Sequence, residues 1–200
     1  MNEHQHRDKD GATLGMWLFL FTELILFGGL FLLYAVYLAR YPHEFAIGGK
    51  ELNVVFGAIN TVVLLTSSLL AAMAVTAIQR DQKFSSIRLL LGTIGCALIF
   101  LAIKYVEWSE KFSHNLYPGS QRLITGQPGE SVFFSLYFLT TGLHGLHVLI
   151  GGTLLGFVAV RVRQGKIDSS NYSWLENGAL YWHLVDLIWI FIFPLYYLIL

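Results

Sequence analysis

Five long apolar runs dominate this sequence and limit what it can fold into. They span about residues 14–38, 54–77, 89–106, 132–160 and 179–200, with short polar segments between them. A helix of about 20 apolar residues crosses the roughly 30 Å hydrocarbon layer of a bilayer. Strands of membrane barrels instead alternate apolar and polar side chains, whereas these runs are continuously apolar. We therefore predict an all-α polytopic membrane protein, a bundle of five transmembrane helices.

Composition agrees with lipid as the main solvent. Of the 200 residues, 13% are charged, about half the share found in soluble domains. The net charge is zero, so no basic surface indicates nucleic-acid binding. The single cysteine, Cys96, excludes an intrachain disulfide and a CxxC metal site. We predict one transmembrane domain over residues 14–200, preceded by a polar tail over residues 1–13.

The distribution of basic residues predicts the orientation in the membrane. Of the 13 Lys and Arg residues, eight lie in the segments on the same side as the N-terminus and five on the opposite side. Cytoplasmic segments of membrane proteins carry an excess of Lys and Arg. We therefore predict a cytoplasmic N-terminus, and five spans then place the C-terminus outside.

Five ionisable residues lie at membrane depth, where a charge costs at least ~2.5–3.5 kcal/mol. They are Glu23 in the first run, His144 and His147 in the fourth, and His183 and Asp186 in the fifth. Each of the two later pairs has a spacing of three, which places both members on one helix face. We predict a buried polar seam between these three helices, in which Glu23 hydrogen-bonds to His183 directly or through one water.

Small and polar residues mark the faces on which helices are expected to pack closely. The predicted packing positions are Gly57, Asn60, Thr61, Gly145, Gly152 and Gly156. Another polar pattern ends the third run, where Lys104, Glu107 and Lys111 share one helix face. We interpret that pattern as a solvated helix end at the outer surface.

The histidines leave three functions open at this level. His144 and His147 share one helix face and cannot both bind one haem iron axially, although His144 and His183 could. A zinc site would need three or four converging ligands. Hydrogen bonding between helices, a haem or metal site, and proton handling or transport therefore all remain possible from the spacing.

Together, the motifs resemble subunit III of the haem–copper oxidases, the cytochrome c oxidase subunit 3 family, in its short five-helix bacterial form. The first similar segment is GMWLFLFTELILFGGLF, which contains Glu23. The others, in family order, are INTVVLLTSS, LTTGLHGLHVLIGG and LYWHLVDLIWIFIF. They cover most of the chain, from about Gly15 to Tyr197.

The resemblance implies a cofactor-free accessory subunit of a bacterial aerobic terminal oxidase, which is not catalytic alone. Haem and copper would belong to partner subunits of a complex that couples O2 reduction to proton pumping. The implied partners are oxidase subunits I and II and membrane phospholipids, in the bacterial inner membrane. The implied role is to support proton uptake into subunit I and its stability during turnover. Glu23 would match the carbodiimide-reactive carboxyl of the family, and the histidines its buried polar framework.

Alternatives within and outside this family remain. Longer members have seven helices, of which the first two form one wall of a lipid-filled cleft, whereas this sequence has five. Short members also accompany quinol oxidases and nitric oxide reductase, although Glu23 and the form YWHLVD favour the cytochrome c branch. A haem b membrane anchor and a small transporter are the more distant alternatives.

Overall fold

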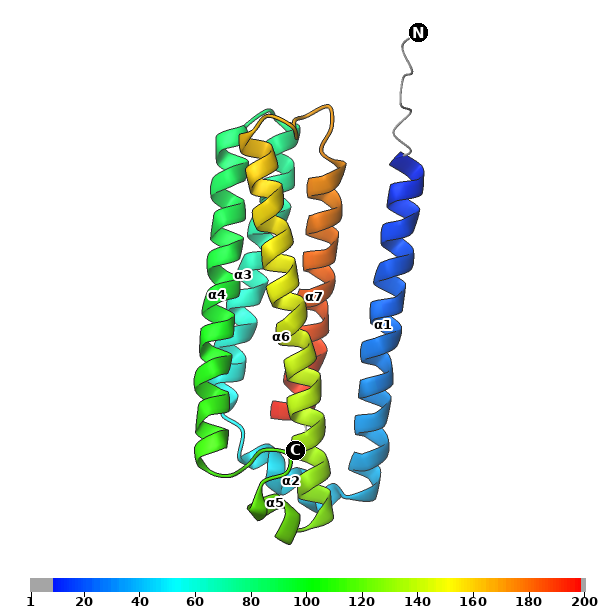
Figure 1. Ribbon diagram of the computed structural model, residues 1–200, viewed down its shortest axis with the longest axis vertical. Coiled ribbons are helices and arrows are strands. Elements are labelled where there is room, and N and C mark those ends of the chain that lie inside the picture. Colours follow the sequence, from blue (N-terminus) through cyan, green and yellow to red (C-terminus); the bar gives the residue numbers. More distant parts are fainter. Residues whose placement is uncertain (1–8, 199–200) are drawn as a thin grey trace.

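The structure is a computed structural model that describes residues 9–198, and every helix of that part runs nearly along one direction except two short ones (Figure 1). The helices are α1 (Lys9–Arg40), α2 (Pro42–Lys50), α3 (Val54–Gln79), α4 (Lys83–Ser113), α5 (Gln121–Thr125), α6 (Pro128–Arg163) and α7 (Ser173–Tyr197). Five of them, α1, α3, α4, α6 and α7, are long and apolar enough to cross a membrane. The predicted all-α, five-span architecture is therefore confirmed.

Local sequence signals fix where several helices begin and turn. The Asn53 side chain accepts hydrogen bonds from the backbone amides of Val55 and Phe56, at 3.0 and 3.4 Å, and caps α3. Proline occupies the first turn of α2 and α6, where its missing N–H costs no helical hydrogen bond. Gly165, with φ +71°, follows α6, a backbone conformation that glycine adopts without strain.

The helices extend beyond the predicted apolar runs. Helix α4 covers 31 residues, which is about 46 Å at 1.5 Å per residue. This length exceeds the roughly 30 Å hydrocarbon layer, so the polar ends of the helix extend beyond it. Helix α1 begins at Lys9, inside the predicted polar tail, and residues 1–8 of that tail lie outside the described part. Helix α7 begins at Ser173 instead of residue 179. The short helices α2 and α5 lie in segments that were expected to be loops.

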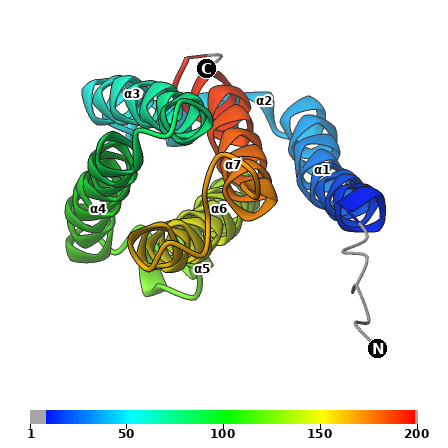
Figure 2. The ribbon, with the colours of Figure 1, turned by 90° about the horizontal axis from the view of Figure 1, so that it is seen from above.

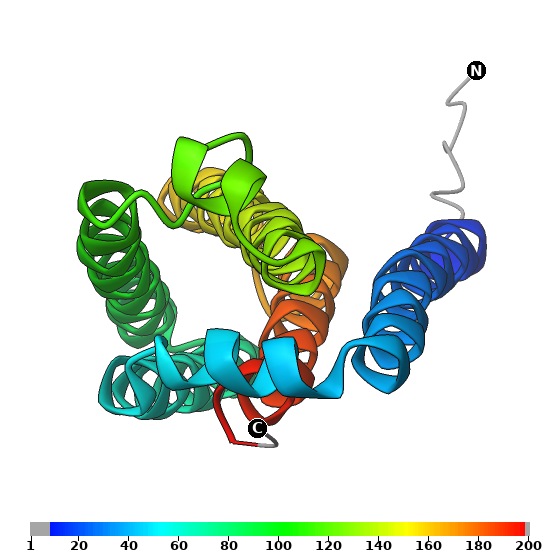
Figure 3. The same ribbon diagram turned by 90° about the horizontal axis from the view of Figure 1, so that it is seen from below.

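Four of the long helices form one group, and α1 lies beside it. Viewed from above, α3, α4, α6 and α7 surround a common interior, while α1 stands next to α7 and α6 (Figure 2). From below, α2 crosses from α1 toward α3 (Figure 3). In the most apolar window of each helix, 11% of α1 residues are buried, against 56% in α7. Helix α7 therefore forms the centre of the fold and α1 its edge.

Side-chain hydrogen bonds fix the register of α7 against α3. Trp182 and Trp189 donate from their indole nitrogens to Ser67 and Thr61, at 2.9 and 3.0 Å. Both tryptophans are fully buried. At the far end of the contact, a Cβ on Gly57 would lie 2.7 Å from the Phe193 ring. Glycine is therefore required there for the close approach of the two helices.

Candidate functional site

A carboxyl–imidazole pair joins the edge helix α1 to the four-helix group. Glu23 Oε2 lies 2.9 Å from His147 Nε2, and His147 Nδ1 lies 2.8 Å from the Leu143 carbonyl oxygen. Because a carbonyl only accepts, Nδ1 carries a proton and donates to it. The contact with Glu23 then contains one further proton, on either the carboxyl or the imidazole. In both cases the pair is neutral overall, which avoids the cost of a net charge at membrane depth.

The predicted partner of Glu23 is wrong. His183 lies on α7, and its Nδ1 is 2.7 Å from Ser68 Oγ, which ties α7 to α3. His147, on α6, is the histidine that faces α1. The spacing of three in each motif assigned both histidines to helix faces, but it left open how each helix is rotated toward α1.

The other predicted seam residues lie inside the four-helix group. His144 is fully buried, and its ring centroid is 5.4 Å from Phe100 and 5.2 Å from Trp189. Asp186 is 3% exposed. Neither side chain has a hydrogen-bond partner among the described residues. The five ionisable residues therefore form no single seam, because only Glu23 and His147 bond to each other.

The predicted packing residues occupy two different helix contacts. Asn60 is fully buried in the four-helix group, and its amide has no hydrogen-bond partner in the described part of the chain. Three glycines of α6 face α4, where an added Cβ would meet side chains at 3.8–3.9 Å, an ordinary contact distance: Gly145, Gly152 and Gly156. Among the α6 glycines, Gly151 instead lies close to α7, where a Cβ would be 2.9 Å from the Trp182 ring.

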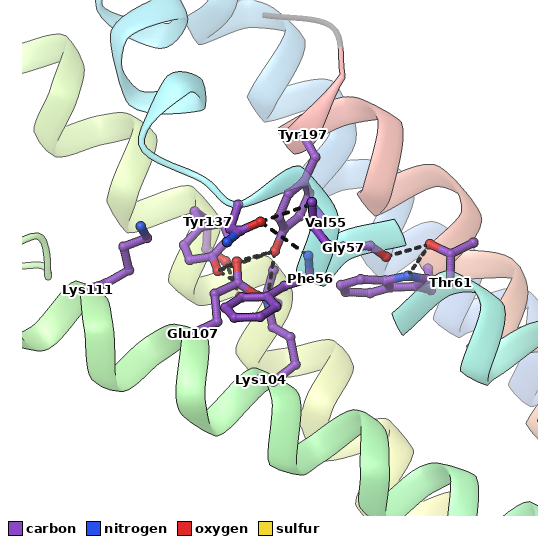
Figure 4. Close-up of polar contacts among 12 residues, drawn as sticks. Val55, Phe56, Gly57, Thr61, Lys104, Glu107, Lys111, Tyr137 and Tyr197 are labelled. Atoms are coloured by element: carbon purple, nitrogen blue, oxygen red, sulfur yellow. Dashed lines mark hydrogen bonds and ion pairs between the residues drawn. The ribbon is translucent and has the colours of Figure 1, made fainter. Parts of the chain in front are cut away.

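A second ionic group, which we call the Lys104 cluster, was not predicted from the sequence. It comprises Lys104, Glu107, Tyr137 and Tyr197, from helices α4, α6 and α7 (Figure 4). Lys104 Nζ donates to Glu107 Oε2 at 3.0 Å and to the hydroxyls of Tyr137 and Tyr197 at 3.1 and 2.9 Å. Both tyrosines donate to Glu107 Oε1, at 2.8 and 2.6 Å. All three ammonium protons and both carboxylate oxygens are thereby satisfied.

The interpretation of this helix end as solvated is wrong. Lys104 is 6% exposed, Glu107 0% and Lys111 2%. Lys111 donates to the backbone carbonyl of Glu51, just after α2. The shared face of these residues was read correctly from the spacing, but it points into the bundle. The local sequence pattern could not show that these residues are buried, because the two tyrosines that bond to them lie on other helices.

The described residues contain no group of three or more His, Cys, Asp or Glu side chains arranged to hold a metal ion. Each histidine at membrane depth has a different contact within the described residues. His147 binds Glu23, His183 binds Ser68, and His144 lies between aromatic rings.

Comparison with known proteins identifies relatives along the whole chain. The family model "Cytochrome c oxidase subunit III" matches residues 1–199. The "Cytochrome c oxidase subunit 3" of Thermostichus vulcanus is 31% identical, over 98% of this chain and 92% of its own length. The "Cytochrome bo(3) ubiquinol oxidase subunit 3" of Pseudomonas aeruginosa is 28% identical, over 98% of this chain and 89% of its own.

A third relative is a longer protein. The "Heme-copper oxidase subunit I+III" of Aeropyrum pernix is 30% identical over 98% of this chain, which spans 24% of that relative's length. The match to the family model covers nearly every residue, including the Glu23, His147 and Lys104 positions. This chain is a multi-pass membrane protein that belongs to the cytochrome c oxidase subunit III family.

Proposed function

We propose that this chain is the accessory subunit III of a bacterial aerobic terminal oxidase of the cytochrome c type. The observation that carries the proposal is the match to the family model over residues 1–199. Accessory subunits of this family belong to haem–copper oxidases whose cofactors lie in other subunits. On this basis, haem and copper would be held by partner subunits, and this chain would support proton uptake and stability in the complex.

We further propose that the chain packs on catalytic subunit I, with subunit II in the same complex. The name of the Aeropyrum pernix relative indicates that the counterparts of subunits I and III form one chain in that protein, which supports a direct contact here. Much of the outer surface is apolar, as on α1, where Leu18 and Ile25 are 59% and 60% exposed. Such a surface suits both a partner helix and lipid.

The test of the oxidase assignment is purification of the tagged chain from its own membranes in mild detergent. We expect haem a, copper and two larger subunits to accompany it, as shown by a visible spectrum and a subunit gel. Recovery of the chain alone and coloured would favour a haem b anchor. Crosslinking before solubilisation prevents the detergent from stripping partners away. If the crosslinked chain is then recovered alone and colourless, the result would contradict the assignment and favour a transporter.

A quinol oxidase is the second candidate, because the Pseudomonas aeruginosa relative covers the chain as completely as the cytochrome c oxidase relatives do. The same purification separates the two candidates. Haem o or b with copper would indicate a quinol oxidase, and haem b with non-haem iron would indicate a nitric oxide reductase complex.

We also propose that phospholipid binds in an apolar groove between α1 and α7. The groove has two neighbouring parts, of about 350 and 170 Å³, which share Leu24 and Leu187 in their walls. Gly28 lines the smaller part, and nothing lies within 4 Å of a Cβ built on it. A side chain at this position would therefore start in open space and extend into the groove.

Replacing Gly28 by Leu should reduce the phospholipid that remains bound to the purified complex, because the new side chain occupies the space of an acyl chain. Native mass spectrometry measures the retained lipid. The matched control is Gly15→Leu, since Gly15 lies on the same helix, also has open space around it and does not line the groove. Equal lipid retention in both variants would contradict lipid binding at this groove.

We propose that the chain lies in the bacterial inner membrane with its N-terminus in the cytoplasm. In a Cys96→Ala background, Ser170→Cys should react with an impermeant maleimide only after the membrane is opened. Asn115→Cys, in the connection after α4, should react in intact spheroplasts. The two positions lie at opposite ends of the helix bundle, so each serves as the control for the other, and the reverse pattern would contradict the proposed orientation.

A further inference from the structure

We propose that Asn60, His144 and Asp186 bind a small cluster of ordered water molecules inside the four-helix group. The three side chains come from α3, α6 and α7. Both amide atoms of Asn60, both ring nitrogens of His144 and both carboxyl oxygens of Asp186 are buried without a hydrogen-bond partner among the described residues. The inference rests on these groups and is independent of the oxidase assignment.

Trp189 of α7 gives a common reference for the positions of the three side chains. The His144 ring centroid lies 5.2 Å from that of Trp189. Asp186 precedes Trp189 by three residues and so lies on the same face of α7. The Trp189 indole donates to Thr61, the neighbour of Asn60 in the chain. His144 thus contacts this tryptophan, Asp186 lies one helical turn before it, and Asn60 is adjacent in the chain to the residue that accepts its indole hydrogen bond.

The buried face of α3 meets the same face of α7. Asn60 and Ser67, seven residues apart, share one side of α3, and both are fully buried. Ser67 accepts the indole hydrogen bond of Trp182. Asp186 lies between Trp182 and Trp189 on α7, at spacings of four and three. Its carboxyl is therefore directed into the interior that α3 lines.

Water is the ligand that matches this set of groups. The amide of Asn60 donates and accepts, the neutral imidazole of His144 does both, and the carboxyl of Asp186 accepts and, when protonated, also donates. A water molecule also donates and accepts, and a buried one makes about three hydrogen bonds. A buried polar group without a partner costs about 1–3 kcal/mol, and lipid cannot supply one. About two waters would satisfy all six atoms.

No side chain of the described residues hydrogen-bonds to Asp186 in place of the proposed waters. The Ser68 hydroxyl lies near the Asp186 carboxyl, but no hydrogen bond joins the two side chains in the structure. The Ser68 hydroxyl is instead bonded to His183 at 2.7 Å. A bridging water would connect Asp186 to its neighbours without breaking that bond.

The first experiment is an electron-microscopy map of the membrane complex that contains the full chain, at a resolution that shows ordered water. We expect density within hydrogen-bond distance of at least two of the three side chains. The internal control is the Thr140–Tyr196 pair, whose hydroxyls are 3.0 Å apart and leave no room for water between them. A dry interior, or rotated side chains that bond directly to one another or to Ser68, would overturn the proposal.

The second experiment compares two substitutions of one residue by thermal unfolding of the same complex. Asp186→Asn keeps two polar atoms for water and should leave the Tm near that of the wild type. Asp186→Leu removes them, so waters bound to Asn60 and His144 lose a partner and the Tm should fall by several degrees. In a dry core, Leu would replace an unpaired carboxyl and raise the Tm. A raised Tm in Asp186→Leu, or an equal loss in both variants, would overturn the proposal.

Discussion

Replacing Lys104 by Met should destabilise the protein more than any other single substitution considered for this chain. The change leaves the Glu107 carboxylate, which is 0% exposed, without its cationic partner. Removing one member of a buried ion pair costs about 3–5 kcal/mol, and 1 kcal/mol corresponds to roughly 2–4 °C in a chain of this size. A fall of about 10 °C in the Tm of the purified complex is therefore the expected result.

A double-mutant cycle tests whether the loss comes from the unpaired charge. Glu107→Gln alone should also lower the Tm, because it leaves the buried ammonium without a carboxylate. The double variant, Lys104→Met with Glu107→Gln, contains no unpaired charge, so it should be more stable than either single variant. Lys50→Met is the matched control, since Lys50 is exposed at the end of α2. Additive losses in the double variant would show that the pair does not act as a unit.

The sequence predicted the transmembrane helices well because each depends on local composition. Long apolar runs with few charges can satisfy their backbone in lipid only as helices, and this holds whatever their neighbours are. The polar ends of α4 and α6 were harder to predict. Beyond the hydrocarbon layer, helix continuation depends on caps and on packing of α2 and α5, which hydropathy does not record.

The polar contacts were predicted less well because they depend on helix rotation and on distant partners. Helical spacing placed Lys104 and Glu107 on one face, yet Tyr137 and Tyr197 lie 33 and 93 positions from Lys104. No local pattern connects them. Glu23 was correctly selected as a residue in need of a partner, but three histidines were available at similar depth. Only the arrangement of α1 against α6 selects His147.

The Glu23–His147 pair leads to the second prediction, which concerns the attachment of α1. Tyr34 OH donates to the Leu195 carbonyl oxygen at 2.6 Å and holds the half of α1 that leads to α2. The other half has Glu23 as its described ionic contact to α6. Glu23→Ala removes this bond and leaves His147 Nε2 without a partner, at a cost of about 1–3 kcal/mol. The population with α1 detached at this half should therefore rise roughly 10-fold.

Spin-label distances between α1 and α6, with labels at the exposed positions Leu18 and Leu146, measure this separation in the assembled complex. Glu23→Ala should broaden the distribution toward longer distances. Glu23→Gln should leave it unchanged, because the amide of Gln donates to the neutral imidazole and the original pair is already neutral overall. Thr22→Ala is the control, since the Thr22 hydroxyl bonds, within the described residues, to the Phe19 carbonyl of its own helix. If Gln separates the helices as fully as Ala does, an ionised Glu23 facing an imidazolium is required, and a neutral hydrogen bond does not hold α1 in place.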